Sequence, residues 1–81
     1  FLNLYVYAQV RTAKGRMDIL LKTDTAIYVM ELKINGSVDD ALQQINDKGY
    51  TIPYEADGRK VVKVGINFST EDRTIKEWKV E

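Results

Sequence analysis

Residues 26–34 read Ala-Ile-Tyr-Val-Met-Glu-Leu-Lys-Ile, and this stretch decides the fold. Its Ile, Tyr and Val residues predict a β-strand. Because successive side chains of a strand point to opposite faces, Glu31 and Lys33 share one face while Leu32 lies on the other. The strand therefore ends on an acid and a lysine that share a surface.

The segment before it, residues 16–22 (Arg-Met-Asp-Ile-Leu-Leu-Lys), predicts a second strand, and residues 23–25 predict a tight turn. A hairpin with an even-length loop at this turn fixes the cross-strand pairs. The predicted pairs are Lys22 with Ile27, Leu20 with Val29, Asp18 with Glu31, and Arg16 with Lys33. Opposed residues of antiparallel strands lie about 5 Å apart at Cβ, so Asp18 and Glu31 are expected to face each other.

Two facing carboxylates repel each other unless a positive charge lies between them. Mg²⁺ is the natural candidate, because it prefers oxygen ligands, is held by one or two carboxylates and keeps waters that can attack phosphorus. Lys33 could then orient or deprotonate the attacking water, or stabilise charge on the phosphate. The alternative is a solvated strand face with salt bridges of small value. Apolar neighbours on both faces of the hairpin favour the metal site, since buried acids are unfavourable unless paired or metal-bound.

The rest of the chain adds stretches that predict further strands and one stretch with helical periodicity. The predicted strands are residues 4–11, 60–69 and 74–80, and the predicted helix lies at about 37–49. Ser37 is the expected N-cap of this helix and Gly49 its expected left-handed end. The order β-β-β-α-β-β predicts an α+β domain whose mixed sheet carries the crossing helix on one face.

The chain has 81 residues, 44% of them hydrophobic and 30% charged, which predicts a single domain over residues 1–81. The absence of Cys and His excludes thiolate nucleophiles, disulfides, imidazole bases and the usual zinc ligands. Twelve basic residues balance twelve acidic ones, which argues against a dedicated DNA-binding module but not against an enzyme. The sequence contains no apolar run long enough to predict a membrane segment, so we expect a cytoplasmic protein. Because the sequence begins with Phe1 and not with Met, we expect it to be a fragment of a longer protein.

An ordered set of residues runs along the chain: Gly15-Arg16-Met17-Asp18, then Glu31-Leu32-Lys33, then Gln44 and Tyr50. This set resembles the PD-(D/E)XK nuclease superfamily, in particular the nuclease-like domain found at the C-terminal end of AAA-type ATPase-like proteins. The segment 64–68 and Trp78 also look like that family. The resemblance covers nearly the whole chain and implies a restriction-endonuclease-like core.

The resemblance implies that Asp18 and Glu31 are catalytic residues that hold Mg²⁺ or Mn²⁺, with the Leu32 backbone carbonyl as a further ligand. It implies that Lys33 is the catalytic lysine and that Gln44 and Tyr50 assist at the phosphate or the metal. For Gln44 the alternative is a helix-surface amide, and for Tyr50 a packing residue. Arg16 is expected to be a structural partner of the acids or a phosphate contact.

Two departures from the family separate the hypotheses. Relatives usually have a core helix before the first strand, absent here, and an acid near the position of Gln9. The leading hypothesis is a Mg²⁺-dependent nuclease that hydrolyses DNA. The expected partner is an ATPase-like domain in the same full-length chain, and no membrane association is expected. A homo-oligomer is left open. With Gln9 in place of the acid, the alternative is a degenerate nuclease fold kept as a nucleic-acid or protein interaction module. A third reading is a structural α+β domain whose acids form salt bridges.

Overall fold

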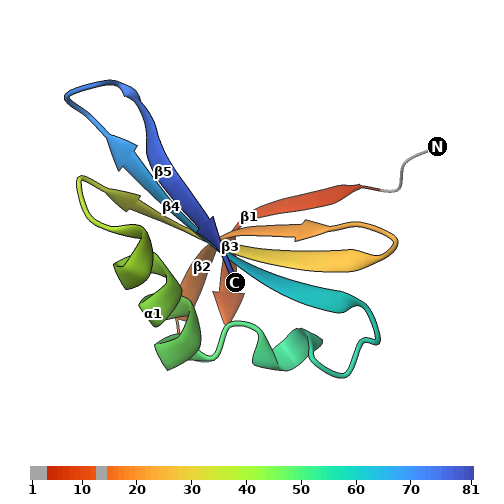
Figure 1. Cartoon of the computed structure of the whole chain (residues 1–81). Coiled ribbons are helices and arrows are strands. Elements are labelled where there is room, and N and C mark those ends of the chain that lie inside the picture. The colour runs from red at the N-terminus through yellow and green to blue at the C-terminus, as the bar shows by residue number, and fades with distance from the viewer. Residues whose placement is uncertain (1–3, 13–14) are drawn as a thin grey trace.

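The computed structural model describes residues 4–12 and 15–81, and within them it contains a sheet and one α-helix (Figure 1). The elements are β1 (Tyr5–Thr12), β2 (Gly15–Lys22), β3 (Ala26–Ile34), α1 (Val38–Lys48), the 3₁₀ helix η1 (Ile52–Tyr54), β4 (Lys60–Ser69) and β5 (Thr74–Val80). The α+β class and the predicted strands are therefore present, and η1 is an addition to the predicted elements. The turn predicted before β2 includes residues 13 and 14, which lie outside the described part.

The sheet is mixed, and its strands lie in the order β1-β2-β3-β4-β5. All neighbouring pairs are antiparallel except β3 and β4, which run parallel. Parallel neighbours need a crossover connection, and α1 with η1 supplies it. Both helical segments lie on the same side of the sheet (Figure 1).

Helix α1 begins and ends where the sequence predicts. The Ser37 side chain accepts a hydrogen bond from the Asp40 backbone N–H at 3.0 Å, and Gly49 ends the helix in the left-handed region at φ 60°. A glycine on β4 brings the helix close to the sheet, because a Cβ at Gly65 would lie 2.7 Å from the Val38 carbonyl oxygen. Among the described helices, none combines the length and the apolar character needed to cross a membrane.

The core lies between α1 and the sheet. Its buried cluster consists of Met17, Leu20, Ile27, Val29, Leu42, Ile45 and Tyr50. Strict alternation predicts Met17 on the face opposite Leu20, and this prediction is wrong because both side chains are in the cluster. The β1–β2 pairing omits Gln9, whose φ is 52°, so the strands are irregular beside Asp18 and Met17 turns inward.

Candidate metal centre

The hairpin register agrees with the predicted one at its turn end, where Lys22 pairs with Ile27 and Leu20 with Val29. The ladder between β2 and β3 ends one step before the two acids, at the pair of Ile19 and Met30. Asp18 and Glu31 therefore follow the last rung of the ladder. The strands separate there, and the two acids flank the gap between them.

The predicted pair of Arg16 with Lys33 is wrong for the same reason. Beyond the end of the ladder, Arg16 pairs with Arg11 of β1 and not with β3. The Arg16 side chain is exposed, and within residues 4–12 and 15–81 it forms no salt bridge with either acid. These observations do not support the expected role of Arg16 as a structural partner of the acids.

Asp18 fills the gap between the strands. Its Oδ2 accepts a hydrogen bond from the Leu32 backbone N–H at 2.8 Å, so a carboxylate satisfies a donor that has lost its strand partner. In an extended strand the N–H and C=O of one residue point to the same side. The Leu32 carbonyl, a predicted ligand, therefore faces the same gap as Asp18.

Glu31 is buried, with 4% of its surface exposed, on the helix side of β3. Its Oε1 accepts a hydrogen bond from Gln44 Nε2 at 2.8 Å, whereas its Oε2 has no hydrogen-bond partner among the described residues. Burial raises the pKa of Glu31 from 4.5 to about 7, and the negative charge of Asp18 and the proximity of the two carboxyl groups add to this, while the Asp18 backbone and Lys33 oppose it. The Glu31 carboxyl therefore lies beside Asp18, although no hydrogen bond to Oε2 meets the geometric criteria among the described residues. Glu31 is therefore a buried acid whose charged form is unfavourable unless a positive charge lies beside it.

Lys33 and Glu31 are joined through one amide. Lys33 Nζ donates to Gln44 Oε1 at 2.6 Å, and the nitrogen of the same amide donates to Glu31. Gln44 reaches both because α1 packs across β3 and β4. The sequence placed Gln44 on the helix beside the apolar stripe, and the structure shows it in contact with both charged residues rather than as a free surface amide.

Tyr50 lies away from the two carboxylates and supports the start of β2. It is 1% exposed, and its hydroxyl donates to the Arg16 carbonyl oxygen at 3.1 Å. A Cβ at Gly15 would lie 3.2 Å from the same hydroxyl oxygen, so the small residue leaves room for the ring. Of its two predicted roles, packing is the one that these contacts match.

One polar residue near the site was given no role by the sequence. Asn67 is buried in β4, and its Oδ1 accepts the Gly36 backbone N–H at 3.0 Å. This bond joins β4 to the loop between β3 and α1. The available signal was an amide within the run Val64-Gly65-Ile66-Asn67-Phe68, because a buried amide is unfavourable unless it is hydrogen-bonded.

The residues at the gap fit a magnesium-type ion. No cluster of three acidic, His or Cys side chains that could hold a metal ion is found within the described residues. The oxygen donors at the gap are the carboxylates of Asp18 and Glu31 and the Leu32 carbonyl. Mg²⁺ commonly takes one or two carboxylates and completes its shell with water and substrate oxygens. The unpartnered Glu31 Oε2 is the observation that favours a cation here.

A mixed sheet with one crossing helix and an acid, acid, lysine set on adjacent strands is a nuclease-like arrangement. The chain belongs to the PD-(D/E)XK nuclease superfamily, whose sequence model matches residues 1–78. It is also 33% identical over 82 residues to an uncharacterized protein in the vnfD 5′ region of Azotobacter chroococcum mcd 1. That match covers 99% of this chain but 16% of the relative, so the chain spans a small part of the relative's length. No solved structure matches the chain.

Proposed function

We propose that this domain is a Mg²⁺-dependent nuclease of the PD-(D/E)XK type that hydrolyses phosphodiester bonds of DNA. Membership in the superfamily supports the reaction class. The observation that carries the proposal is the buried Glu31 Oε2, unpartnered among the described residues and beside the charge of Asp18. A carboxylate in that position is unfavourable until a cation joins it.

Asp18, Glu31 and the Leu32 carbonyl would hold the metal. Bound there, Mg²⁺ would supply a water of lowered pKa and polarise the phosphate. Mn²⁺ is an alternative ion for the same oxygen ligands. The hydrogen bond from the Leu32 N–H to Asp18 holds the carboxylate of Asp18 next to the backbone of Leu32. The two proposed metal ligands are therefore positioned before the metal binds.

Lys33 is proposed to position the attacking water and to stabilise negative charge on the phosphate. Gln44 accepts a hydrogen bond from the Lys33 ammonium and donates one to Glu31, so it holds the ammonium beside the carboxylate. The other donors of Lys33 are then available for the water or the phosphate. Arg16 is proposed as a phosphate contact, because its guanidinium is exposed two residues before Asp18. Gln44 is thus proposed as an accessory residue that acts through Glu31 and Lys33.

Metal titration combined with plasmid nicking tests the proposal. The expected result is saturable Mn²⁺ or Mg²⁺ binding by calorimetry that Asp18→Ala and Glu31→Ala each abolish. Lys33→Ala is expected to keep metal binding and to lose nicking, because Lys33 is not a ligand. Unchanged metal binding in both acid variants would refute the site.

A second candidate function is a degenerate nuclease fold that binds nucleic acid or protein. Gln9 favours it, because the pairs on either side of it, Ala8 with Ile19 and Val10 with Met17, flank the point across from Asp18, where an acid would supply a third carboxylate. This candidate predicts DNA retention in a gel-shift assay without added metal and no nicking with it. An ATPase-like domain in the same full-length chain is a proposal that rests on the family resemblance. The cytoplasmic location expected from the sequence is untested.

A further inference from the structure

A glycine occupies the middle of β4 although its backbone conformation does not call for one. Gly65 is not among the residues with positive φ, so its conformation is open to other residues. Glycine in a strand interior weakens the strand, and it often marks a place where another backbone comes close. At Gly65 that backbone is the first turn of α1, because a Cβ would lie 2.7 Å from the Val38 carbonyl oxygen, whereas ordinary contact begins at 3.4 Å.

The contact at Gly65 has no spare room on the helix side. A Cβ there would also lie 3.1 Å from Leu42 Cγ and 3.2 Å from Ala41 Cβ. Both helix residues are buried, and Leu42 belongs to the core cluster. Because a close-packed core cannot absorb an added methyl group without backbone shifts, a side chain at residue 65 would move α1 away from β4.

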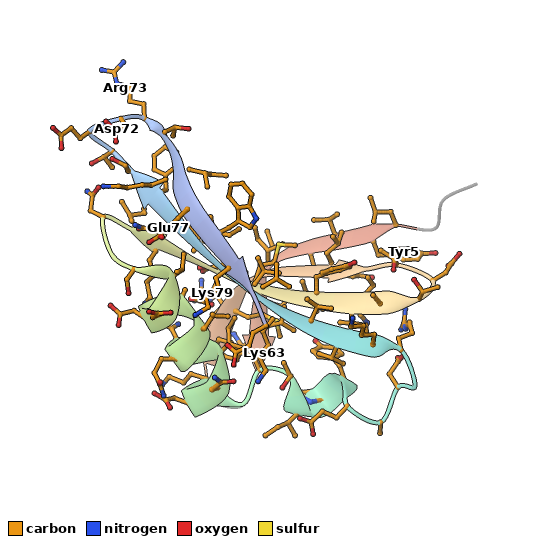
Figure 2. The ribbon with its side chains drawn as sticks, viewed as in Figure 1. Tyr5, Lys63, Asp72, Arg73, Glu77 and Lys79 are labelled. Carbon is orange, nitrogen blue, oxygen red and sulfur yellow. The ribbon has the colours of Figure 1, made fainter. Side chains whose placement is uncertain are left out.

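Two lysines bind α1 to the sheet on either side of this contact. Lys63 Nζ donates to Asn46 Oδ1 at 2.6 Å, and Lys79 Nζ lies 3.3 Å from Asp39 Oδ1. Lys79 pairs with Gly65 across β4 and β5, and Lys63 lies two residues before Gly65. Figure 2 shows Lys63 and Lys79 directed toward the helix. The helix is therefore held to the sheet near both of its ends.

Gly65 is also the direct neighbour of Glu31. The two residues are paired in the parallel β3–β4 register, and both face α1. Gln44 of α1 donates to Glu31 at 2.8 Å and accepts from Lys33 at 2.6 Å. Both bonds join α1 to β3, so a helix that moved away from the sheet would lengthen and weaken both of them.

We propose that Gly65 is a positioning residue for the candidate site. By admitting the backbone of α1, it sets the distance between helix and sheet at which Gln44 reaches Glu31 and Lys33 together. The part that Gly65 plays in the reaction rests on the proposed nuclease function, whereas its effect on the contacts of Gln44 does not. A merely structural glycine would change the stability of the fold and leave these two bonds in place.

NMR of the isotope-labelled chain without metal tests the proposal. The measurement is hydrogen exchange of the Gln44 side-chain amide, whose signal is identified by its loss in Gln44→Leu. In the parent this exchange is expected to be slow, because the amide donates to the buried Glu31. Gly65→Ala is expected to speed it at least about tenfold.

Ile45→Val is the matched control for the exchange measurement. It removes a methyl group from the same buried side of α1 and adds no atom at Gly65. It is expected to lower the stability of the fold and to leave the exchange of the Gln44 amide as in the parent. Equally fast exchange in Ile45→Val and Gly65→Ala would overturn the proposal, because looser packing in general would then explain the effect.

Plasmid nicking adds a readout of the reaction. Gly65→Ala is expected to lower kcat at least about tenfold alone and to lower it no further in the Gln44→Leu background, because both changes act on the same contacts. Losses that simply multiply would overturn the proposal. A parent chain that does not nick overturns the proposed nuclease function instead, and the exchange of the Gln44 amide then decides the role of Gly65.

Circular dichroism shows whether each variant folds. Ala41→Val adds volume on the helix side of the same contact and replaces Gly65→Ala if that variant does not fold. Exchange of the Gln44 amide that stays as slow as in the parent, in whichever of these variants folds, would overturn the proposal.

Discussion

Asp18 Oδ2 accepts a hydrogen bond from the Leu32 N–H at 2.8 Å, so a side chain joins β2 to β3 where their ladder ends. This contact gives Asp18 a structural task besides the proposed metal binding. Asp18→Asn is expected to keep the bond through its amide oxygen and to weaken metal binding at least about tenfold, since it loses a charge. Asp18→Ala is expected to lose the bond as well, with a further loss of about 1.5–3 kcal/mol in unfolding free energy.

Urea unfolding and metal titration of both variants separate the two tasks. If Asp18→Asn destabilises the fold as much as Asp18→Ala does, the bond to Leu32 is not what the carboxylate contributes. If Asp18→Asn binds Mn²⁺ as tightly as the parent, the charge of Asp18 is not needed for the metal.

Glu31 is expected to make the fold less stable at neutral pH than at acid pH. Its pKa is raised from 4.5 to about 7, so between these values the native state keeps a proton that the unfolded chain has lost. The contribution of Glu31 to the free energy of unfolding therefore falls as pH rises through this window, by about 3 kcal/mol in all. Glu31→Gln, which keeps the acceptor for Gln44, is expected to raise the melting temperature at pH 8 but not at pH 4.

The measurement is thermal unfolding of parent and variant across pH 4 to 8 without metal. Saturating Mg²⁺ is expected to stabilise the parent at pH 8 and to leave Glu31→Gln unchanged, because binding to the native state alone adds stability. A melting-temperature difference between the two proteins that does not depend on pH would contradict the raised pKa of Glu31.

Much of the fold could be predicted because each element has local signals. The run AIYVMELKI gave β3 its observed limits, and Ser37 with Gly49 gave those of α1. These signals depend on propensity and capping, which act within a few residues. The even-length loop centred on Asp24 and Thr25 also predicted the correct register for the first rungs of the hairpin.

The site was less predictable because it depends on where pairing stops. The end of the β2–β3 ladder leaves Asp18 bonded to Leu32 and leaves Arg16 paired with Arg11 and not with β3. The irregular backbone at Gln9 on the neighbouring strand accompanies the inward turn of Met17. Alternation assumes continuous pairing and cannot anticipate this break. The contact of Gln44 with Glu31 and Lys33 likewise depends on how α1 packs on the sheet, which no local pattern specifies.

Gln44 is expected to matter through its two contacts. Gln44→Leu removes a donor from Glu31 and an acceptor from Lys33, so we expect a loss of about 1–3 kcal/mol in unfolding free energy and reduced nicking. Gln43→Leu is the matched control, because Gln43 is exposed on the same helix and its side chain donates to Asp47, away from Glu31 and Lys33. Urea unfolding and plasmid nicking of both variants are the measurements, and equal effects would assign Gln44 to the helix surface.

Tyr50 is expected to be a structural anchor. Tyr50→Phe removes its bond to the Arg16 carbonyl and is expected to lower the unfolding free energy by about 1 kcal/mol with little change in nicking rate. Tyr5→Phe, at a position 56% exposed, serves as the control and is expected to change neither property. A large fall in nicking rate with unchanged stability would instead support the role at the phosphate or metal that the family resemblance implies.

Gln9 offers a test by gain of function. The β1–β2 pairs on either side of it, Ala8 with Ile19 and Val10 with Met17, place residue 9 across from Asp18. Gln9→Glu would add a third carboxylate next to the proposed metal, and we expect about tenfold tighter Mn²⁺ binding, since affinity rises with ligand charge. Without metal the same variant is expected to be less stable, because three carboxylates repel one another.

Calorimetric Mn²⁺ titration and thermal unfolding of Gln9→Glu check these two expectations together. Gln43→Glu adds the same charge on the exposed side of α1 and is expected to leave metal affinity unchanged, which separates a local ligand from a general effect of net charge. Tighter binding in both variants would point to net charge alone. Tighter binding in Gln9→Glu alone, lost again when Asp18→Ala is added, would place the metal between β1, β2 and β3.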